Sequence, residues 1–220
     1  MSRLVDLSHT IRAGLVTYPG LPAPEIRPFL TREDSTANYA AGTQFAVDVI
    51  TMIGNTGTYI DSPFHRYEGG TDLAGLDLGI LVDQPAEIFH FQDVSVRGIS
   101  AKALVGRKLR GRAVLLDTGW SRLFGTPEYG AGAPFLTRDG AAYLVNQGVT
   151  LVGIDSVNID DVESGGERPA HSLLLAAGIP VVEHLTSLDE LPESGSRVTV
   201  VPPKIEGFGT FPVRAFARVP

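Results

Sequence analysis

Residues 138–154, R-D-G-A-A-Y-L-V-N-Q-G-V-T-L-V-G-I, contain the pattern that decides the fold class of this chain. The stretch 138–147 predicts a helix that ends at Gly148, because glycine readily adopts the left-handed conformation found where helices stop. The apolar residues 150–154 then predict a buried strand. A helix that leads through a glycine into a buried strand is typical of α/β proteins.

The same alternation continues on both sides of this stretch. Residues 113–116, 179–182 and 198–201 predict further strands, and residues 169–177 predict a helix that stops at Gly178. The N-terminal half is richer in strands: residues 44–49 alternate with a period of two, and residues 85–91 predict another strand. We therefore expect an α/β fold with a mixed sheet, a β-rich N-terminal portion and strand–helix alternation in the C-terminal half. No repeat or low-complexity linker divides the chain, so residues 1–220 are expected to form a single domain.

The composition excludes several classes of function. The formal net charge is −7, and no cluster of lysine and arginine is present to neutralise the phosphates of nucleic acid or the anionic surface of a membrane. The chain has no cysteine, which removes disulfides, thiolate nucleophiles and cysteine metal sites together. No signal segment and no membrane-spanning run is recognisable. We expect a cytoplasmic protein that binds a small molecule.

The chemistry is concentrated in residues 55–65, N-T-G-T-Y-I-D-S-P-F-H. If residues 55–61 are extended, Asn55, Tyr59 and Asp61 share one face, with Gly57 leaving space beside them. Pro63 ends the extended stretch and leads to His65. A simple turn, in which Asp61 caps backbone amides and His65 lies at the surface, is the alternative interpretation.

A second group of residues favours a site. His171 follows Arg168-Pro169-Ala170 at the start of a predicted helix, and Glu183 ends the next predicted strand. These positions meet near the strand ends where open α/β sheets place their sites. Taken singly, each residue is better explained by a surface or capping role, but together with Asp61 and His65 they indicate a site. His184, next along the strand, is expected to point to the opposite face.

These residues resemble the cyclase family, which includes bacterial kynurenine formamidase and isatin hydrolase. The family signature is H-x-G-T-H-x-D-x-P-x-H, and the chain matches it at Gly57, Thr58, Asp61, Pro63 and His65. Further resemblances extend over nearly the whole chain: D-L-S-H-T-I at 6–11, Y-P-G at 18–20, D-T-G-W at 117–120, G-I-D-S at 153–156, His171 with Glu183, and the ending P-P-K-I-E-G-F-G-T-F-P-V-R-A-F-A. The resemblance implies a β/β/α fold, hydrolysis of amides or cyclic amides, and a homo-oligomer, either a dimer or a tetramer.

The resemblance also implies roles for individual residues. Asp61, His171 and Glu183 correspond to metal ligands, and His65 corresponds to the catalytic acid/base. Tyr18 stands where related formamidases contact the substrate, and Asn55 and Phe64 are assigned with it to substrate binding. Asp61 and Tyr59 are further catalytic candidates, the tyrosine as a proton or hydrogen-bond donor to a developing oxyanion.

The departures from the signature bear on the metal. Asn55 and Tyr59 replace two ligating histidines, the nitrogen donors that zinc and manganese prefer. A site for two ions is therefore disfavoured, although unorthodox ligands would permit it. A single Zn²⁺ or Mn²⁺ on Asp61, His171 and Glu183 and a site without metal both remain open, with a slight preference for the second. The sequence thus predicts a cyclase-family enzyme that hydrolyses or cyclises an amide, lactam, lactone or related carbonyl compound, or alternatively a non-catalytic binding protein that has lost the ligands.

Overall fold

The structure, a computed structural model, describes residues 2–91 and 96–220 and is built on one large mixed sheet. The nine strands lie in the order β1 (Arg3–Asp6), β13 (Phe216–Val219), β11 (Ser194–Thr199), β5 (Gln84–His90), β7 (Ala113–Asp117), β9 (Leu151–Ile154), β10 (Val181–Glu183), β4 (Tyr59–Asp61) and β12 (Thr210–Pro212). The four strands from β5 to β10 are parallel, and the strands on either side of them pair antiparallel. The expected α/β fold with a mixed sheet is confirmed.

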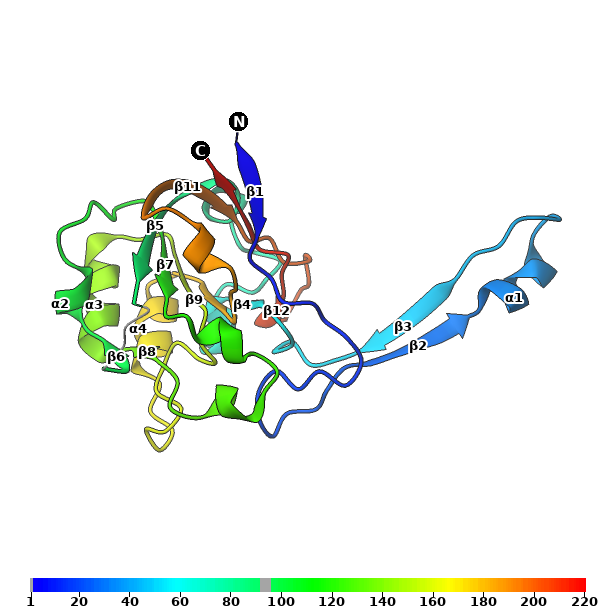
Figure 1. Ribbon diagram of the computed structural model, residues 1–220, viewed down its shortest axis with the longest axis horizontal. Helices are drawn as coiled ribbons and strands as arrows, with labels where there is room; N and C mark the ends of the chain where they lie inside the picture. The colour runs from blue at the N-terminus through cyan, green and yellow to red at the C-terminus, as the bar shows by residue number, and fades with distance from the viewer. Residues whose placement is uncertain (1, 92–95) are drawn as a thin grey trace.

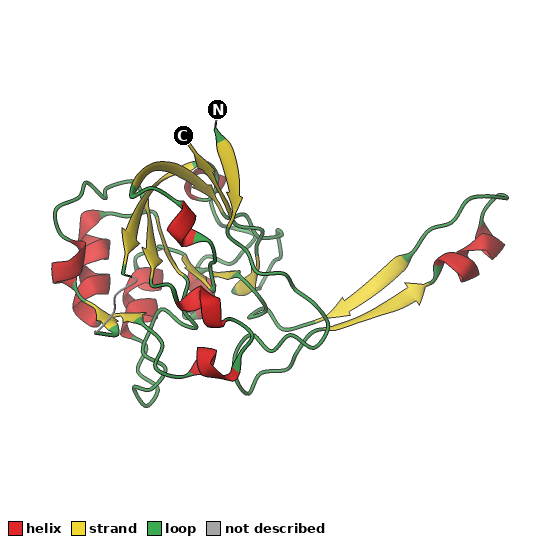
Figure 2. Ribbon diagram, in the orientation of Figure 1, coloured by secondary structure: helices red, strands yellow, loops and turns green. Residues whose placement is uncertain are grey.

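Helices cover one face of this sheet (Figure 2). They are α2 (Ala101–Leu104), α3 (Arg138–Gln147) and α4 (Pro169–Ala176). The helix expected at 138–147 is confirmed, and it ends at Gly148 with a φ of 70°. The apolar side chains of α3 and α4 pack with Val114, Leu116 and Val152 in one continuous core cluster.

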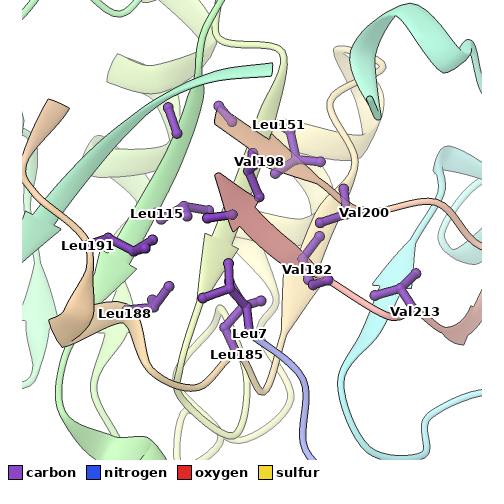
Figure 3. Close-up of a cluster of buried hydrophobic side chains, with 14 of the residues drawn as sticks. Leu7, Leu115, Leu151, Val182, Leu185, Leu188, Leu191, Val198, Val200 and Val213 are labelled. Carbon is purple, nitrogen blue, oxygen red and sulfur yellow. The ribbon is translucent and has the colours of Figure 1, made fainter. Parts of the chain in front are cut away.

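A second core fills the other face of the sheet (Figure 3). Leu115, Leu151 and Val182 point to this side, opposite to their neighbours along the same strands, because successive side chains of a strand alternate between faces. Segments from both ends of the chain complete the cluster, among them Leu7 and Val213. The central strands are therefore buried on both faces, as their uniformly apolar sequences predict.

An arm extends away from the body of the protein (Figure 1). It consists of the antiparallel pair β2 (Glu25–Leu30) and β3 (Val47–Thr51), with the short helices α1 (Arg32–Ser35) and η1 (Thr36–Asn38) near its tip. The strand predicted from the alternation at 44–49 is thus present, although it begins three residues later and ends two residues later. The alternation predicts one buried face, however, and β3 has no fully buried residue. The arm contacts too little of the body to bury either face.

The remaining elements are short. The strands β6 (Gly98–Ile99) and β8 (Phe135–Leu136) form a two-residue parallel pair, and the 3₁₀ turns are η2 (Pro63–His65), η3 (Leu78–Ile80), η4 (Trp120–Leu123), η5 (Pro127–Gly130) and η6 (Leu188–Glu190). Among the described residues, none of the helices is both long and apolar enough to cross a bilayer.

Candidate active site

The candidate site is a cavity of about 350 Å³ beside the antiparallel strands β10, β4 and β12. The pairing register of these strands brings its residues together. Tyr59 of β4 lies directly opposite Glu183 of β10, and Asp61 lies opposite Thr210 of β12. Directly opposed residues of an antiparallel pair project from the same face, so the phenol meets one carboxylate and the threonine hydroxyl meets the other.

Residues 55–61 are only partly extended. β4 covers Tyr59–Asp61, whereas Gly57 turns the chain just before it with a φ of 66°. The continuous strand expected over 55–61 is therefore wrong, because the glycine adopts a left-handed conformation that a strand does not contain. Asn55 nevertheless lines the same cavity as Tyr59 and Asp61.

His171 lies at the centre of three carboxylates. Its Nδ1 is 2.7 Å from Asp160 Oδ2, while its Nε2 lies 3.3 Å from Asp61 Oδ2 and 3.4 Å from Glu183 Oε1. Asp160 also accepts hydrogen bonds from the backbone N–H groups of Ala170 and His171, which fixes the first turn of α4. Burial alone would lower the pKa of His171, but the charges and hydrogen bonds of the three carboxylates raise it to about 10.

Glu183 is held by donors on both carboxylate oxygens. Its Oε1 accepts from the Ile159 N–H at 2.6 Å, and its Oε2 accepts from the Tyr59 hydroxyl at 2.6 Å. Burial and the neighbouring Asp61 charge raise the pKa of Glu183 to about 7, although His171 opposes this shift. Burial and the charges of Glu183 and Asp61 also raise the pKa of Tyr59, so the phenol is protonated and donates to Glu183.

His65 is positioned by Thr210. The Thr210 hydroxyl donates to Asp61 Oδ1 and lies 2.7 Å from His65 Nδ1. Because the single hydroxyl proton is directed at the carboxylate, the oxygen accepts from an N–H at His65 Nδ1. His65 Nε2 therefore remains available for a substrate or a water. His65 itself follows Pro63 in η2, as the proline predicts.

His184 is part of the same network, contrary to the expectation from strand alternation. Its backbone φ is 56°, so the pleat of β10 ends at Glu183 and the buried imidazole turns back toward Tyr59. His184 Nε2 lies 3.3 Å from the Tyr59 oxygen, and His184 Nδ1 lies 2.8 Å from the hydroxyl of Tyr129. Burial lowers the pKa of His184 to about 3, so the ring is neutral.

These bonds have one consistent direction. The Tyr59 hydroxyl donates its hydrogen bond to Glu183, so the Tyr59 oxygen accepts a hydrogen bond from His184 Nε2–H. The unprotonated His184 Nδ1 in turn accepts a hydrogen bond from the Tyr129 hydroxyl. We call this chain from Tyr129 through His184 and Tyr59 to Glu183 the tyrosine–histidine relay. Tyr129, Asp160 and Thr210 are not predicted from the sequence, since only the fold brings them to the site. Thr210 alone has a local signal, its place after Gly209 in the family-like ending.

The other substrate-binding candidates lie at two places. Tyr18 lines the candidate-site cavity together with Leu21, Arg66, Asn158, Arg168 and Ser172. Phe64 lies outside this cavity and lines a neighbouring hollow with Phe208, Gly209 and Thr210. Asn55 and His65 line both.

The metal-ligand candidates fit one ion. One ligand atom from each of Asp61, His171 and Glu183 lies within 4.8 Å of the others. His171 Nε2 lies 3.3 Å from Asp61 Oδ2 and 3.4 Å from Glu183 Oε1. Two ligand atoms of a tetrahedral zinc ion, each bonded at about 2.1 Å, are separated by a similar distance. Asp160 on His171 Nδ1 is the outer carboxylate typical of metal-binding histidines. Tyr59 donates its hydrogen bond to Glu183 Oε2 and Asn55 offers only an amide, so neither adds a strong ligand for a second ion.

Comparisons with known proteins agree with the fold and with the family resemblance of the sequence. The family model described as "Putative cyclase" matches residues 5–161. Kynurenine formamidase of Geobacillus thermodenitrificans is 29% identical over 218 residues, covering 99% of this chain and 98% of the relative. The crystal structure of an isatin hydrolase bound to the product analogue thioisatinate superimposes with a TM-score of 0.84 at 24% identity, covering 100% of this chain and 93% of the other. The structure titled "predicted metal-dependent hydrolase from Bacillus stearothermophilus" superimposes with a TM-score of 0.78 at 26% identity, covering 99% and 98%.

The family match covers well over half of the chain, and the fold and the Asp–Ser–Pro–Phe–His segment agree with it. The chain therefore belongs to the cyclase family.

Proposed function

We propose that this protein, acting as one domain over residues 1–220, hydrolyses a small molecule at an amide, lactam or lactone carbonyl, with His65 as the general acid/base. The observation that carries the proposal is the orientation of His65, whose Nδ1 is fixed by Thr210 while its Nε2 is left available beside the buried carboxylates. The names of the relatives, a formamidase and an isatin hydrolase, support hydrolysis of an amide-like bond.

The proton transfers follow from this arrangement. His65 Nε2 takes a proton from a water as the water oxygen attacks the carbonyl carbon, and the same nitrogen returns that proton to the leaving nitrogen or oxygen. The intervening oxyanion needs donors, and the cavity lining offers the Asn158 amide and the Nε2–H of protonated His171, each in exchange for its present contact with Glu183 or Asp61. Tyr59 assists an oxyanion only in exchange for its bond to Glu183.

We further propose that Asp61, His171 and Glu183 hold at most one divalent ion, Zn²⁺ or Mn²⁺. Such an ion would supply Lewis-acid polarisation of the carbonyl. Elemental analysis of protein purified without added metal tests this directly. A content near two ions per chain would contradict the proposal, whereas one or none agrees with it.

The test of the activity compares two histidine variants on a panel containing N-formylkynurenine, isatin and simple lactones. We expect His65→Gln to lower kcat by about 10²- to 10⁴-fold, the usual contribution of a general acid/base. His90→Gln is the matched control, because His90 pairs with Asp117 outside the cavity. Unchanged turnover in His65→Gln would contradict the assignment. Wild-type protein that binds these compounds without converting them would instead favour a non-catalytic binding protein.

We also propose that the protein is a homo-oligomer in which the arm packs against a second copy. Phe29 is 75% exposed and Phe45 is 52% exposed, and an isolated two-stranded ribbon is at best marginally stable in water. In sedimentation experiments, the double change Phe29→Ser with Phe45→Ser should shift the protein toward the monomer. Leu78→Ser, which alters an exposed leucine on the body, should leave the distribution unchanged. A monomeric wild type would overturn this proposal.

A further inference from the structure

Two arginines line the cavity that also holds the catalytic candidates. Arg66 directly follows His65, and Arg168 precedes Pro169 at the start of α4. Both line the cavity that holds Asp61 and Glu183. Arg66 is exposed and Arg168 is half-buried, so the two guanidinium groups border the cavity where solvent reaches it.

Neither arginine has a carboxylate partner within ion-pair distance among the residues that the structure describes. Arg168 Nη1 donates to the main-chain oxygens of Glu167 at 2.8 Å and Asp161 at 3.3 Å, bonds that orient the group without neutralising it. The Arg66 Nε–H reaches only Ser172 Oγ, at 3.5 Å, and its guanidinium carbon lies 5.5 Å from the centre of the Tyr67 ring.

Glu167 adjoins Arg168 in the chain but forms no ion pair with it among the described residues, and two other acids of this loop are paired elsewhere. Asp161 and Glu163, in the loop that leads to Arg168, both pair with Arg97 at 2.7 Å. The buried carboxylates of the cavity have their own donors: Asp61 is bonded to Thr210 and His171, and Glu183 to Tyr59 and the Ile159 N–H. The charge of the two rim arginines is thus left for a ligand.

From these contacts we infer that the substrate carries an oxyanionic group, a carboxylate or a phosphate, which binds Arg66 and Arg168 while the reacting carbonyl lies at the floor near His65. The planar guanidinium group binds such oxyanions through two parallel N–H bonds. Tyr18 and Leu21 line the same cavity and provide an apolar wall for the body of the molecule. This inference rests on the proposed function, since it takes the cavity to be the active site.

The experiment measures binding of three probes that contain no hydrolysable bond: benzoate, phenylphosphonate and neutral acetophenone. Chelator-treated protein is used, so that the anions cannot bind through a metal. We expect wild type to bind at least one of the two anions about tenfold more tightly than acetophenone, in line with charge-assisted hydrogen bonds. The preference for benzoate over phenylphosphonate, or the reverse, identifies which oxyanion the rim accepts. High salt should weaken the preference.

The variants assign the preference to residues. The double change Arg66→Gln with Arg168→Gln should abolish it, and each single change should reduce it. Arg110→Gln is the matched control, because Arg110 lies beside Gly148 at the C-terminal end of α3 and does not line the cavity. A wild type that shows no preference for either anion, or a preference that survives in the double variant, would overturn the inference. Because no probe is turned over, the result does not depend on whether the protein is a hydrolase.

Discussion

The single hydroxyl of Thr210 connects Asp61 with His65 in the candidate catalytic group. The change Thr210→Val keeps the shape of the side chain but leaves Asp61 Oδ1 without this donor and His65 Nδ1 without this acceptor. We expect a loss of about 1–3 kcal/mol in unfolding free energy and a fall in kcat of about 10- to 100-fold, because the ring of His65 is no longer held in one tautomer. Urea unfolding and steady-state kinetics measure the two effects. Thr210→Ser should restore both, and a valine variant with normal kcat would contradict the positioning role.

Tyr129 begins the tyrosine–histidine relay, and its removal tests the direction of the relay. In Tyr129→Phe the buried Nδ1 of His184 loses its donor, at a cost of about 1–2 kcal/mol. The Nε2–H tautomer of His184 is then no longer favoured over the Nδ1–H tautomer. The ¹⁵N chemical shifts of the imidazole measure the populations of the two tautomers. Tyr143→Phe on α3 is the control. An unchanged tautomer would show that Tyr129 does not set it.

At the scale of elements, β12 approaches η2 so closely that only glycine fits between them. A Cβ at Gly209 would lie 2.6 Å from His65 Cα and 2.7 Å from His65 N. Gly209→Ala should therefore push η2 away from β12, lower stability by about 1–3 kcal/mol and reduce turnover. Gly69→Ala, where a Cβ would meet nothing within 4 Å, should change neither. Thermal unfolding and kinetics of the two variants would show whether close packing of the elements holds His65.

The elements that the sequence predicts well are those with a local cause. The helix at 138–147 and its stop at Gly148 are confirmed, because the apolar pattern and the glycine act within a few residues. The arm could not be predicted from residues 44–49, since alternation records which side chains are apolar and not what covers them. Among residues of the site, His184 was misplaced because a left-handed backbone at a non-glycine residue has no reliable sequence signal.

The placement of Thr210 opposite Asp61 shows why the rest of the site was missed. The two residues are 149 positions apart, and only the pairing of β4 with β12 joins them. Asp160 is likewise brought to α4 by a loop and not by a helical repeat. Family resemblance identified the residues that match a signature, whereas the partners that orient them follow from the register of the sheet.

For the whole molecule, the buried charges predict how stability depends on pH. The pKa of His171 is raised from 6.5 to about 10, so its contribution to stability is full below pH 6.5 and is lost as pH rises toward 10. The pKa of Glu183 is raised from 4.5 to about 7, so its contribution to stability is likewise lost as the pH rises, but between pH 4.5 and 7. The pKa of Asp61 is lowered, so its contribution is lost only as the pH falls into strong acid. Chelator-treated protein should therefore be less stable at pH 10 than at pH 6 in urea unfolding. His171→Gln should flatten this dependence, and equal slopes in the two proteins would contradict the prediction.

The pairing of β1 with β13 has a consequence for how the chain reaches its fold. Arg3 pairs with Val219, and β4 between β10 and β12 completes its pairing only when residues 210–212 are available. Contacts so distant in sequence must close long loops, which slows folding to the range of milliseconds to seconds or longer. During synthesis, the parallel strands β5, β7 and β9 emerge before β11 covers the edge of β5, and β13 emerges later still to cover the edge of β11. The nascent chain therefore exposes unpaired strand edges until β13 has left the ribosome, and it is at this stage that we expect it to depend most on chaperones.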